Sequence, residues 1–220
     1  MQNWIFDIRS GRFFVLLAFF VILSYLVYAK ITQPIDNAII TYAQSLGGNQ
    51  VLDLTMQIFT EIGSVFYMII FCIILFIKKS TRRLGLVLIL SILAGTIASA
   101  YMKDFVGQER PQLEFAGKPF PIALERDSSF FGIGSFPSGH ATRSAAFAFV
   151  IGFALSARFP RGCYLLWAYP LLVSISRVFI LQHFPMDVIG GTVLGILVAD
   201  IISKKLKLHL IFEKSKAKLL

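Results

Sequence analysis

Six long apolar stretches constrain this chain more than any other feature of its sequence. They cover about residues 13–29, 58–77, 84–102, 141–157, 163–181 and 188–203. Each has roughly 16–20 residues, and as an α-helix is about 24–30 Å long, enough to cross a bilayer core when its end residues reach the interface. Only helices and closed barrels satisfy the backbone hydrogen bonds in lipid, and these stretches lack the alternation of barrel strands. The sequence therefore predicts an all-α polytopic membrane protein, a bundle of six transmembrane helices.

The composition agrees with a membrane protein and excludes a soluble one. Hydrophobic residues make up 56% of the 220 residues and charged residues 15%, whereas an average globular domain carries about a quarter charged residues. No internal repeat or Gly/Ser-rich linker divides the chain, so we expect a single domain over residues 1–220. Cys72 and Cys163 lie inside apolar stretches, where they are expected to be ordinary hydrophobic side chains rather than metal ligands.

The distribution of basic residues predicts the orientation. With six crossings, fourteen basic residues fall on the side of the two termini and five on the opposite side. The fourteen are Arg9, Arg12, Lys78, Lys79, Arg82, Arg83, Arg158, Arg161, Lys204, Lys205, Lys207, Lys214, Lys216 and Lys218. The five are Lys30, Lys103, Arg110, Lys118 and Arg126. By the positive-inside rule both termini are cytoplasmic, and we expect a bacterial inner (plasma) membrane protein. Topology accounts for most of the net charge of +9, so membrane lipids are expected partners and nucleic acid is not. The oligomeric state stays open.

The first outer connection, residues 30–57, has an amphipathic pattern. Ile35, Ile39, Ile40 and Ala43 recur near helical spacing, and Gly47-Gly48-Asn49 interrupts the pattern. We expect a helix that lies at the membrane surface. This side of the membrane therefore has structure beyond the six crossings.

Polar residues of a particular kind gather on the same outer side. Two of the three histidines, His140 and His183, lie at outer helix ends, on the side of Lys103 and Arg110. Arg177 lies inside an apolar stretch, where a charge is costly and usually functional. One such residue alone would be an ordinary interfacial side chain. Their convergence on one face instead predicts a site.

These residue types suit the transfer of a phosphoryl group. Three cations surround an anion, and arginine forks match phosphate oxygens. Ser138-Gly139 begin a predicted helix whose N–H groups and dipole favour an anion. One histidine attacks phosphorus while the other protonates the leaving oxygen. Asp187, four residues after His183, is able to hold the histidine tautomer, and Pro185 suits the first turn of the last helix. This chemistry passes through a phosphohistidine and needs no metal or other cofactor.

The three motifs that carry these residues resemble those of the type 2 phosphatidic acid phosphatase (PAP2) superfamily, KxxxxxxRP, PSGH and SRxxxxxHxxxD. Here they read Lys103 to Pro111, Pro137 to His140, and Ser176 to Asp187, complete and in order. The resemblance implies that His183 is the nucleophile, Asp187 its orienting partner, and His140 the general acid and later the base. It implies phosphoryl-binding roles for the remaining motif residues. These are Lys103, Arg110, Ser138, Gly139 and Arg177.

The resemblance leaves the substrate open among lipid phosphates. Candidates are phosphatidylglycerophosphate, phosphatidic acid, undecaprenyl pyrophosphate and lipid A phosphates, and residues 112–136 are expected to shape headgroup choice. Arg143 either contacts a second phosphate or headgroup or snorkels to the interface, and Glu61 forms a buried hydrogen bond or an ion pair. A phosphotransferase that passes the group to another acceptor is the alternative to a phosphatase. A lipid transporter is disfavoured, because its charges would be spread over several depths rather than gathered at one face.

Overall fold

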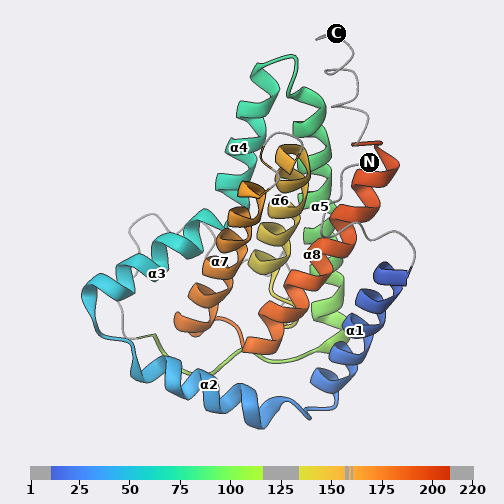
Figure 1. The fold of residues 1–220 in the computed structure, drawn as a ribbon. Helices are drawn as coiled ribbons and strands as arrows, with labels where there is room; N and C mark the ends of the chain where they lie inside the picture. The colour runs from blue at the N-terminus through green and yellow to red at the C-terminus, as the bar shows by residue number, and fades with distance from the viewer. Residues whose placement is uncertain (1–10, 116–133, 157–158, 160, 209–220) are drawn as a thin grey trace.

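The computed structural model describes residues 11–115, 134–156, 159 and 161–208, and these ranges contain helices and no strand. The helices follow one another along the chain (Figure 1). They are α1 (Gly11–Tyr28), α2 (Gln33–Ser45), α3 (Gln50–Ile62), α4 (Val65–Ile77), α5 (Arg82–Val106), α6 (Gly139–Ser156), the 3₁₀-helix η2 (Gly162–Trp167), α7 (Ala168–Phe179) and α8 (Pro185–Lys205). The predicted all-α fold is confirmed.

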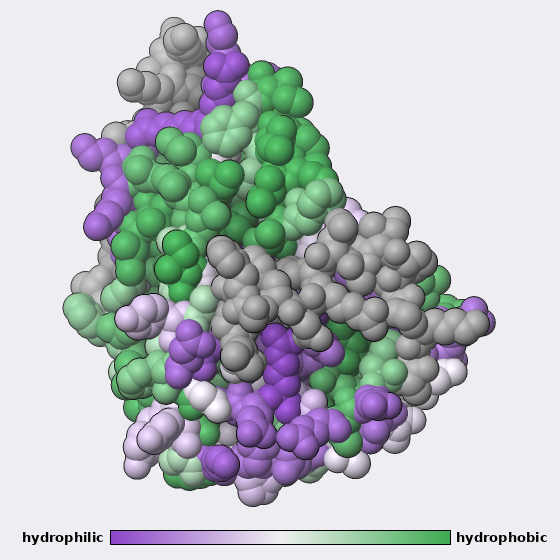
Figure 2. Space-filling view, turned by 180° about the vertical axis from the view of Figure 1, so that it is seen from behind, coloured by the Kyte–Doolittle hydropathy of each residue, from purple (hydrophilic) through white to green (hydrophobic). Residues whose placement is uncertain are grey.

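The helices share a common direction except at one end of the molecule. In Figure 1, α8 ends near the top, α1 runs downward from about mid-height, and α2 lies across the lower end. The last turns of α5 and α7 and the first turns of α8 meet at this lower end, next to α2. Figure 2 shows a broad hydrophobic band on the rear face and hydrophilic residues gathered below it. The lower end is therefore where polar loop residues come together.

Four helical segments are long and apolar enough to cross a membrane by themselves. They are α1, α5, the continuous stretch Gly162–Phe179, and α8. Helices α3 and α4 pass the same test only as a pair, which is bent by 52°. Within the described residues the structure thus has four candidate spans, or five when the bent pair counts as one. The predicted number of six exceeds the larger of these counts by one, and the additional predicted crossing is the segment that forms α6.

The prediction of one continuous helix over residues 58–77 is wrong. Ser64 adopts an extended backbone conformation at the start of α4 and so interrupts the helix after Gly63. A Cβ atom at Gly63 would lie 2.6 Å from Cγ1 of Val173, so the chain bends where α3 packs closely on α7. Hydropathy does not register such a bend, because apolar residues continue on both sides of it.

Helix α6, which the sequence predicted as a crossing over residues 141–157, is not among the candidate spans and is instead the central helix of the bundle. Most of its residues are buried, including His140, Thr142, Arg143 and Ser144 in its first turns. It packs against α5, α7 and α8. A helix enclosed by other helices is free to carry polar residues that lipid would exclude.

Two glycines allow α8 to approach α6 closely. A Cβ atom at Gly191 would collide with the carbonyl oxygen of Ser138, and one at Gly195 with that of Thr142. Glycines four residues apart lie on one face of a helix and permit such close packing in membranes. This contact fixes the first turns of α8 against the first turn of α6, where the motif residues lie.

The amphipathic connector is a helix, as predicted. Helix α2 spans Gln33–Ser45 and buries Ile40 and Ala43. The predicted interruption at residues 47–49 is confirmed, since the Asn49 side chain accepts the N–H groups of Val51 and Leu52 and so caps α3.

Candidate active site

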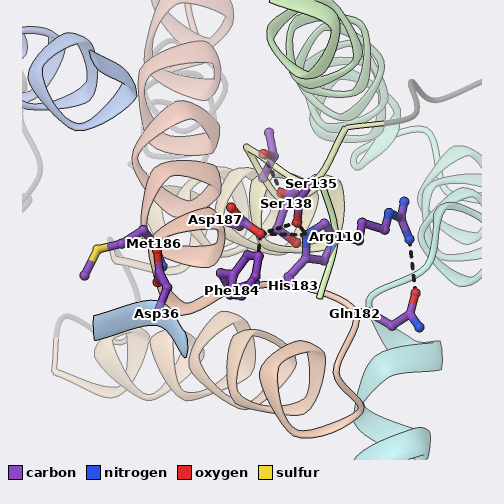
Figure 3. A network of polar contacts seen from close by, with 10 residues as sticks. Asp36, Arg110, Ser135, Ser138, Gln182, His183, Phe184, Met186 and Asp187 are labelled. Carbon is purple, nitrogen blue, oxygen red and sulfur yellow. Dashed lines mark hydrogen bonds and ion pairs between the residues drawn. The ribbon is translucent and has the colours of Figure 1, made fainter. Parts of the chain in front are cut away.

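The centre of the site is a contact between a histidine and a carboxylate. Nδ1 of His183 lies 3.3 Å from Oδ2 of Asp187 (Figure 3). The Ser135 hydroxyl donates a hydrogen bond to the same oxygen and lies 3.3 Å from the same nitrogen. All three side chains are buried. With its proton on Nδ1, facing the carboxylate, the imidazole keeps Nε2 unprotonated and able to attack an electrophile.

The start of α8 builds this contact from residues that are close in sequence. The helix begins at Pro185, as predicted, and its missing N–H costs nothing at this position. Oδ2 of Asp187 accepts the backbone N–H of Phe184 at 2.8 Å and so caps the helix. The N–H of His183 donates to the carbonyl of Arg177 at 3.3 Å, which ties the loop to the end of α7. The spacing of four residues thus places histidine and carboxylate face to face.

Three cations surround His183. Lys103 near the end of α5 and Arg177 near the end of α7 are both buried. Burial lowers the pKa of His183 well below its usual value, and the charges of Arg177, Lys103 and Arg110 lower it further. The imidazole is therefore neutral at pH 7, as a nucleophile must be.

Arg110 reaches the site through a neighbour of the histidine. Its Nη1 donates a 3.0 Å hydrogen bond to Oε1 of Gln182 (Figure 3). Gly107, in the left-handed conformation at φ 64°, ends α5 and turns the chain toward this position. Lys103 and Arg110, the two basic residues of the first motif, are thereby placed near residues of the third motif.

The second motif forms the start of α6 and joins the site through the backbone. The N–H of Ser138 donates to the carbonyl of Asp187 at 2.9 Å, and the carbonyl of Ser138 accepts the N–H of Thr142. The Ser138 hydroxyl oxygen is buried and has no hydrogen-bond partner among the described residues. Gly139 is the first residue of α6. A serine hydroxyl without a partner at a helix N-terminus suits a bound anion.

His140 lies deeper in α6 and is buried as well. The charges of Arg177, Arg143 and Lys103 lie close enough to act on it electrostatically, as does His183. Nη2 of Arg143 lies 3.3 Å from Nδ1 of His140. Arg143 is 2% exposed, so the expectation that it snorkels to the interface is wrong. Its guanidinium instead lies beside the second histidine.

Two polar residues that hold the site together carry no signal in the sequence. Ser135 contributes to the central contact, although its position before the second motif gave no signal. Asp36 of α2 is fully buried, and its Oδ1 accepts the N–H of Met186 at 3.1 Å (Figure 3). Asp36 lies on the buried face of α2 with Ile40 and Ala43, and the sequence gives no sign of a partner 150 positions away.

The structure tests some of the remaining expectations from the sequence and leaves others untested. Asp200 and Lys204 form an ion pair at the far end of α8, at 2.5 Å. Glu61 is buried near the end of α3. Most of the segment expected to shape headgroup choice, residues 116–133, lies outside the described residues. In the described ranges no three His, Cys, Asp or Glu side chains come together as a metal site would require.

The fold and the buried cluster together are those of an integral membrane enzyme, and comparison with known proteins gives the family. The model of the PAP2 superfamily matches residues 84–208. The chain is 29% identical to the undecaprenyl-diphosphatase of Sulfolobus acidocaldarius over 85% of this chain and 87% of the relative. It is 30% identical to phosphatidylglycerophosphatase B of Bacillus subtilis over 83% of this chain and 88% of the relative. The chain belongs to the PAP2 superfamily and is a membrane phosphatase.

A solved structure agrees with this placement. The crystal structure of the transmembrane PAP2 type phosphatidylglycerolphosphate phosphatase from Bacillus subtilis superposes with a TM-score of 0.72 and 25% sequence identity. The similarity covers 87% of this chain and 94% of that one. It therefore extends well beyond the three motifs to the helical bundle as a whole.

Proposed function

We propose that this protein removes the terminal phosphoryl group of a lipid phosphate through a covalent phosphohistidine at His183. The contact of Nδ1 of His183 with the Asp187 carboxylate carries this proposal, because it leaves Nε2 free to attack. The named relatives support a lipid substrate, since one is an undecaprenyl-diphosphatase and the other a phosphatidylglycerophosphatase. The substrate is therefore a phosphomonoester or pyrophosphate of a lipid.

Binding places the phosphoryl group among the cations. Lys103, Arg110 and Arg177 neutralise its charge, and the arginines offer paired donors to its oxygens. Ser138 and the N–H groups at the start of α6, Gly139 included, bind a further oxygen. These groups stabilise the charge that is redistributed over the phosphoryl oxygens in the transition state, which is the main catalytic contribution in phosphoryl transfer.

Two displacement steps then follow. In the first, Nε2 of His183 forms a bond to phosphorus, the bond from phosphorus to the leaving oxygen breaks, and His140 gives that oxygen a proton. The Asp187 carboxylate stabilises the positive charge that develops on the imidazole. In the second step, His140 takes a proton from water, whose oxygen attacks phosphorus. The phosphorus–nitrogen bond breaks, and phosphate and free His183 result. No step uses a metal ion.

The membrane topology follows from the distribution of charge on the fold. Arg12, Lys78, Arg83 and Lys204 lie at ends of α1, α4, α5 and α8 that point away from the site. By the positive-inside rule that end faces the cytoplasm, so both termini are cytoplasmic and the site is extracytoplasmic, in a bacterial inner membrane. The bent pair of α3 and α4 forms one crossing and the enclosed α6 another, which gives six.

The proposal is tested by phosphate release from purified protein. Wild-type protein should release phosphate from lipid phosphates in the presence of a chelator, and His183→Ala should reduce the rate at least a thousandfold. His209→Ala, a change of the remaining histidine, serves as the matched control and should keep the wild-type rate. Undiminished turnover of His183→Ala would overturn the assignment of the nucleophile.

A companion measurement separates hydrolysis from transfer to another acceptor. Both reactions share the phosphohistidine, and they differ in whether water or a second lipid receives the phosphoryl group. Free phosphate should appear at the same rate with and without an added acceptor lipid. A drop in free phosphate, matched by a phosphorylated acceptor, would assign the protein as a phosphotransferase.

A further inference from the structure

Two cavities at the lower end of the molecule share one wall. Residues 107–110 and Gln112 line both of them. The first cavity has a volume of about 540 Å³ and also reaches Lys103 and Gly134. The second has a volume of about 580 Å³ and extends from Arg110 to the end of α1 and along α2. A group bound at Arg110 is therefore able to continue into the second cavity.

Amides are the commonest polar side chains that line the second cavity. Gln33 and Asn37 on α2 face it, joined by a 2.8 Å hydrogen bond, and Gln108 faces it from the shared wall. Gln33, Asn37 and Thr41 lie four residues apart, so they form one polar stripe along the helix. Amides both donate and accept hydrogen bonds, and so do hydroxyl groups. This lining therefore matches a ligand that carries hydroxyls.

A second anionic group is a poorer match for the same lining. A phosphate oxygen only accepts hydrogen bonds, so the amide oxygens of this cavity would oppose it. The cavity has two cations, Lys30 and Arg110, but the carboxylate of Glu109 offsets one of them. Arg110 already donates to Gln182 and belongs to the proposed phosphoryl-binding set. Charge thus favours a neutral polar group over a second phosphate.

Gln108 is the residue in this wall whose side chain most clearly lacks a hydrogen-bond partner among the described residues. Both Nε2 and Oε1 of its side chain are buried, and neither has a hydrogen bond within the described part of the chain. Its backbone carbonyl accepts the N–H of Ser135 at 2.7 Å, which fixes the residue against the central contact of the site. A buried amide with neither its donor nor its acceptor satisfied destabilises a fold, and a ligand that supplies both removes that penalty.

We propose that the second cavity binds a hydroxyl-bearing headgroup and that the Gln108 amide binds a hydroxyl next to the scissile phosphate. The inference rests on the proposed function and narrows its substrate class. The glycerol of phosphatidylglycerophosphate supplies such a hydroxyl on the adjacent carbon, and the phosphorylated sugars of lipid A supply hydroxyls further from the phosphate. Phosphatidic acid and undecaprenyl pyrophosphate leave no free hydroxyl beside the phosphate, so they gain nothing from Gln108.

The test replaces Gln108 with methionine, which has similar length and no hydrogen-bonding amide. The values of kcat and KM are measured for the four substrates in detergent micelles, together with the thermal midpoint. For the hydroxyl-bearing substrate of the protein, kcat/KM should fall about tenfold, the effect expected for one lost hydrogen bond. For phosphatidic acid and undecaprenyl pyrophosphate it should change less than twofold. The thermal midpoint should stay equal or rise, because the variant removes a buried amide without partners.

Two further variants complete the design. Gln44→Met changes an exposed glutamine of α2 that lines neither cavity, and it should leave all four rates unchanged. Asn37→Ala alters an exposed residue on the polar stripe, so its folding is secure, and it should reproduce the selective fall. It decides the question should Gln108→Met fail to fold.

The outcomes separate the inference from the proposed function. An equal loss on all four substrates, or no loss on any, would overturn the headgroup site while leaving the phosphatase intact. A selective loss on phosphatidylglycerophosphate identifies glycerol as the occupant, and a selective loss on lipid A phosphate identifies the sugar. Absence of phosphate release by wild-type protein from every substrate contradicts the proposed function itself.

Discussion

The Ser135 hydroxyl donates its hydrogen bond to Oδ2 of Asp187, the same oxygen that faces Nδ1 of His183. The loop before α6 thus restrains a carboxylate in the first turn of α8. Because Oδ2 also accepts the N–H of Phe184, the carboxylate is held from three directions. Its orientation toward the histidine is thereby fixed before substrate arrives.

Replacing Ser135 with alanine should lower kcat about tenfold and leave KM nearly unchanged. The change removes one hydrogen bond that orients Asp187, and such supporting contacts typically contribute a factor of about ten or more. Steady-state kinetics with the best lipid phosphate measures both parameters. Ser156→Ala, at the far end of α6, is the matched control and should behave as wild type. A rise in KM with constant kcat would show that Ser135 serves binding instead.

Replacing Arg110 with glutamine should move the acidic limb of the pH–rate profile to higher pH. Burial and the charges of Arg177, Lys103 and Arg110 depress the pKa of His183, so wild-type activity falls only when pH drops below about 6.5, the usual histidine value. Removing one of these charges lets the pKa rise, and the histidine then becomes protonated, and inactive, at a higher pH. The profile of kcat/KM from pH 4 to 9 measures the shift.

The control for this experiment removes a comparable charge elsewhere. Arg83, at the start of α5, donates to the carbonyl of Leu206 at the end of the molecule away from the site. Arg83→Gln should leave the acidic limb in place. Equal displacement in both variants would mean that total charge, rather than the local charge at His183, sets the profile.

Replacing Gly195 with alanine should lower the thermal midpoint by several degrees and reduce activity. The added Cβ atom meets the carbonyl oxygen of Thr142 on α6, and such overpacking typically costs about 1–3 kcal/mol. A displacement of α8 also moves Asp187 relative to Ser138. Gly162→Ala is the control, since its Cβ would lie 3.6 Å from the nearest heavy atom, an ordinary contact. Wild-type stability of Gly195→Ala would refute the close packing of α6 and α8.

Replacing Asp36 with asparagine should raise stability relative to wild type increasingly as pH rises, and the alanine variant should be about 1 kcal/mol less stable than the asparagine variant at all pH values. Asparagine keeps an oxygen that accepts the N–H of Met186, and alanine does not. Burial raises the pKa of Asp36 above its usual value, so the folded protein binds this proton more tightly than the unfolded chain. The contribution of the carboxyl to stability is thus present at low pH and lost as pH rises through the raised pKa.

Thermal midpoints between pH 4 and 9 measure this difference. Asn37→Ala, a change of an exposed neighbouring residue that does not titrate, should show no such trend. A constant difference between Asp36→Asn and wild type across this range would contradict a raised pKa.

The sequence predicted those parts of the site that depend on local geometry. His183 and Asp187 are four residues apart around a helix start that Pro185 marks, so their contact follows from the sequence itself. Ser135 and Asp36 join the site from distant segments, and no periodicity relates them to their partners. The bend between α3 and α4 was not predicted for a similar reason, because it arises from the packing of Gly63 on Val173 of α7. Contacts between segments that are distant in the sequence thus account for the features of the fold and the site that local sequence patterns did not predict.

The enclosed position of α6 also bears on how the protein is made. Its first turns carry buried polar side chains, Arg143 among them, and a helix of this kind is unfavourable in lipid without neighbours. Helix α5 precedes it during synthesis, but α8, its most extensive neighbour, is made after it. Stable insertion of α6 therefore waits for α8, which also brings Asp187. A nascent chain truncated before α8 lacks the Asp187 carboxylate and also the helix that packs over α6. Assembly in the bilayer and the onset of activity therefore coincide.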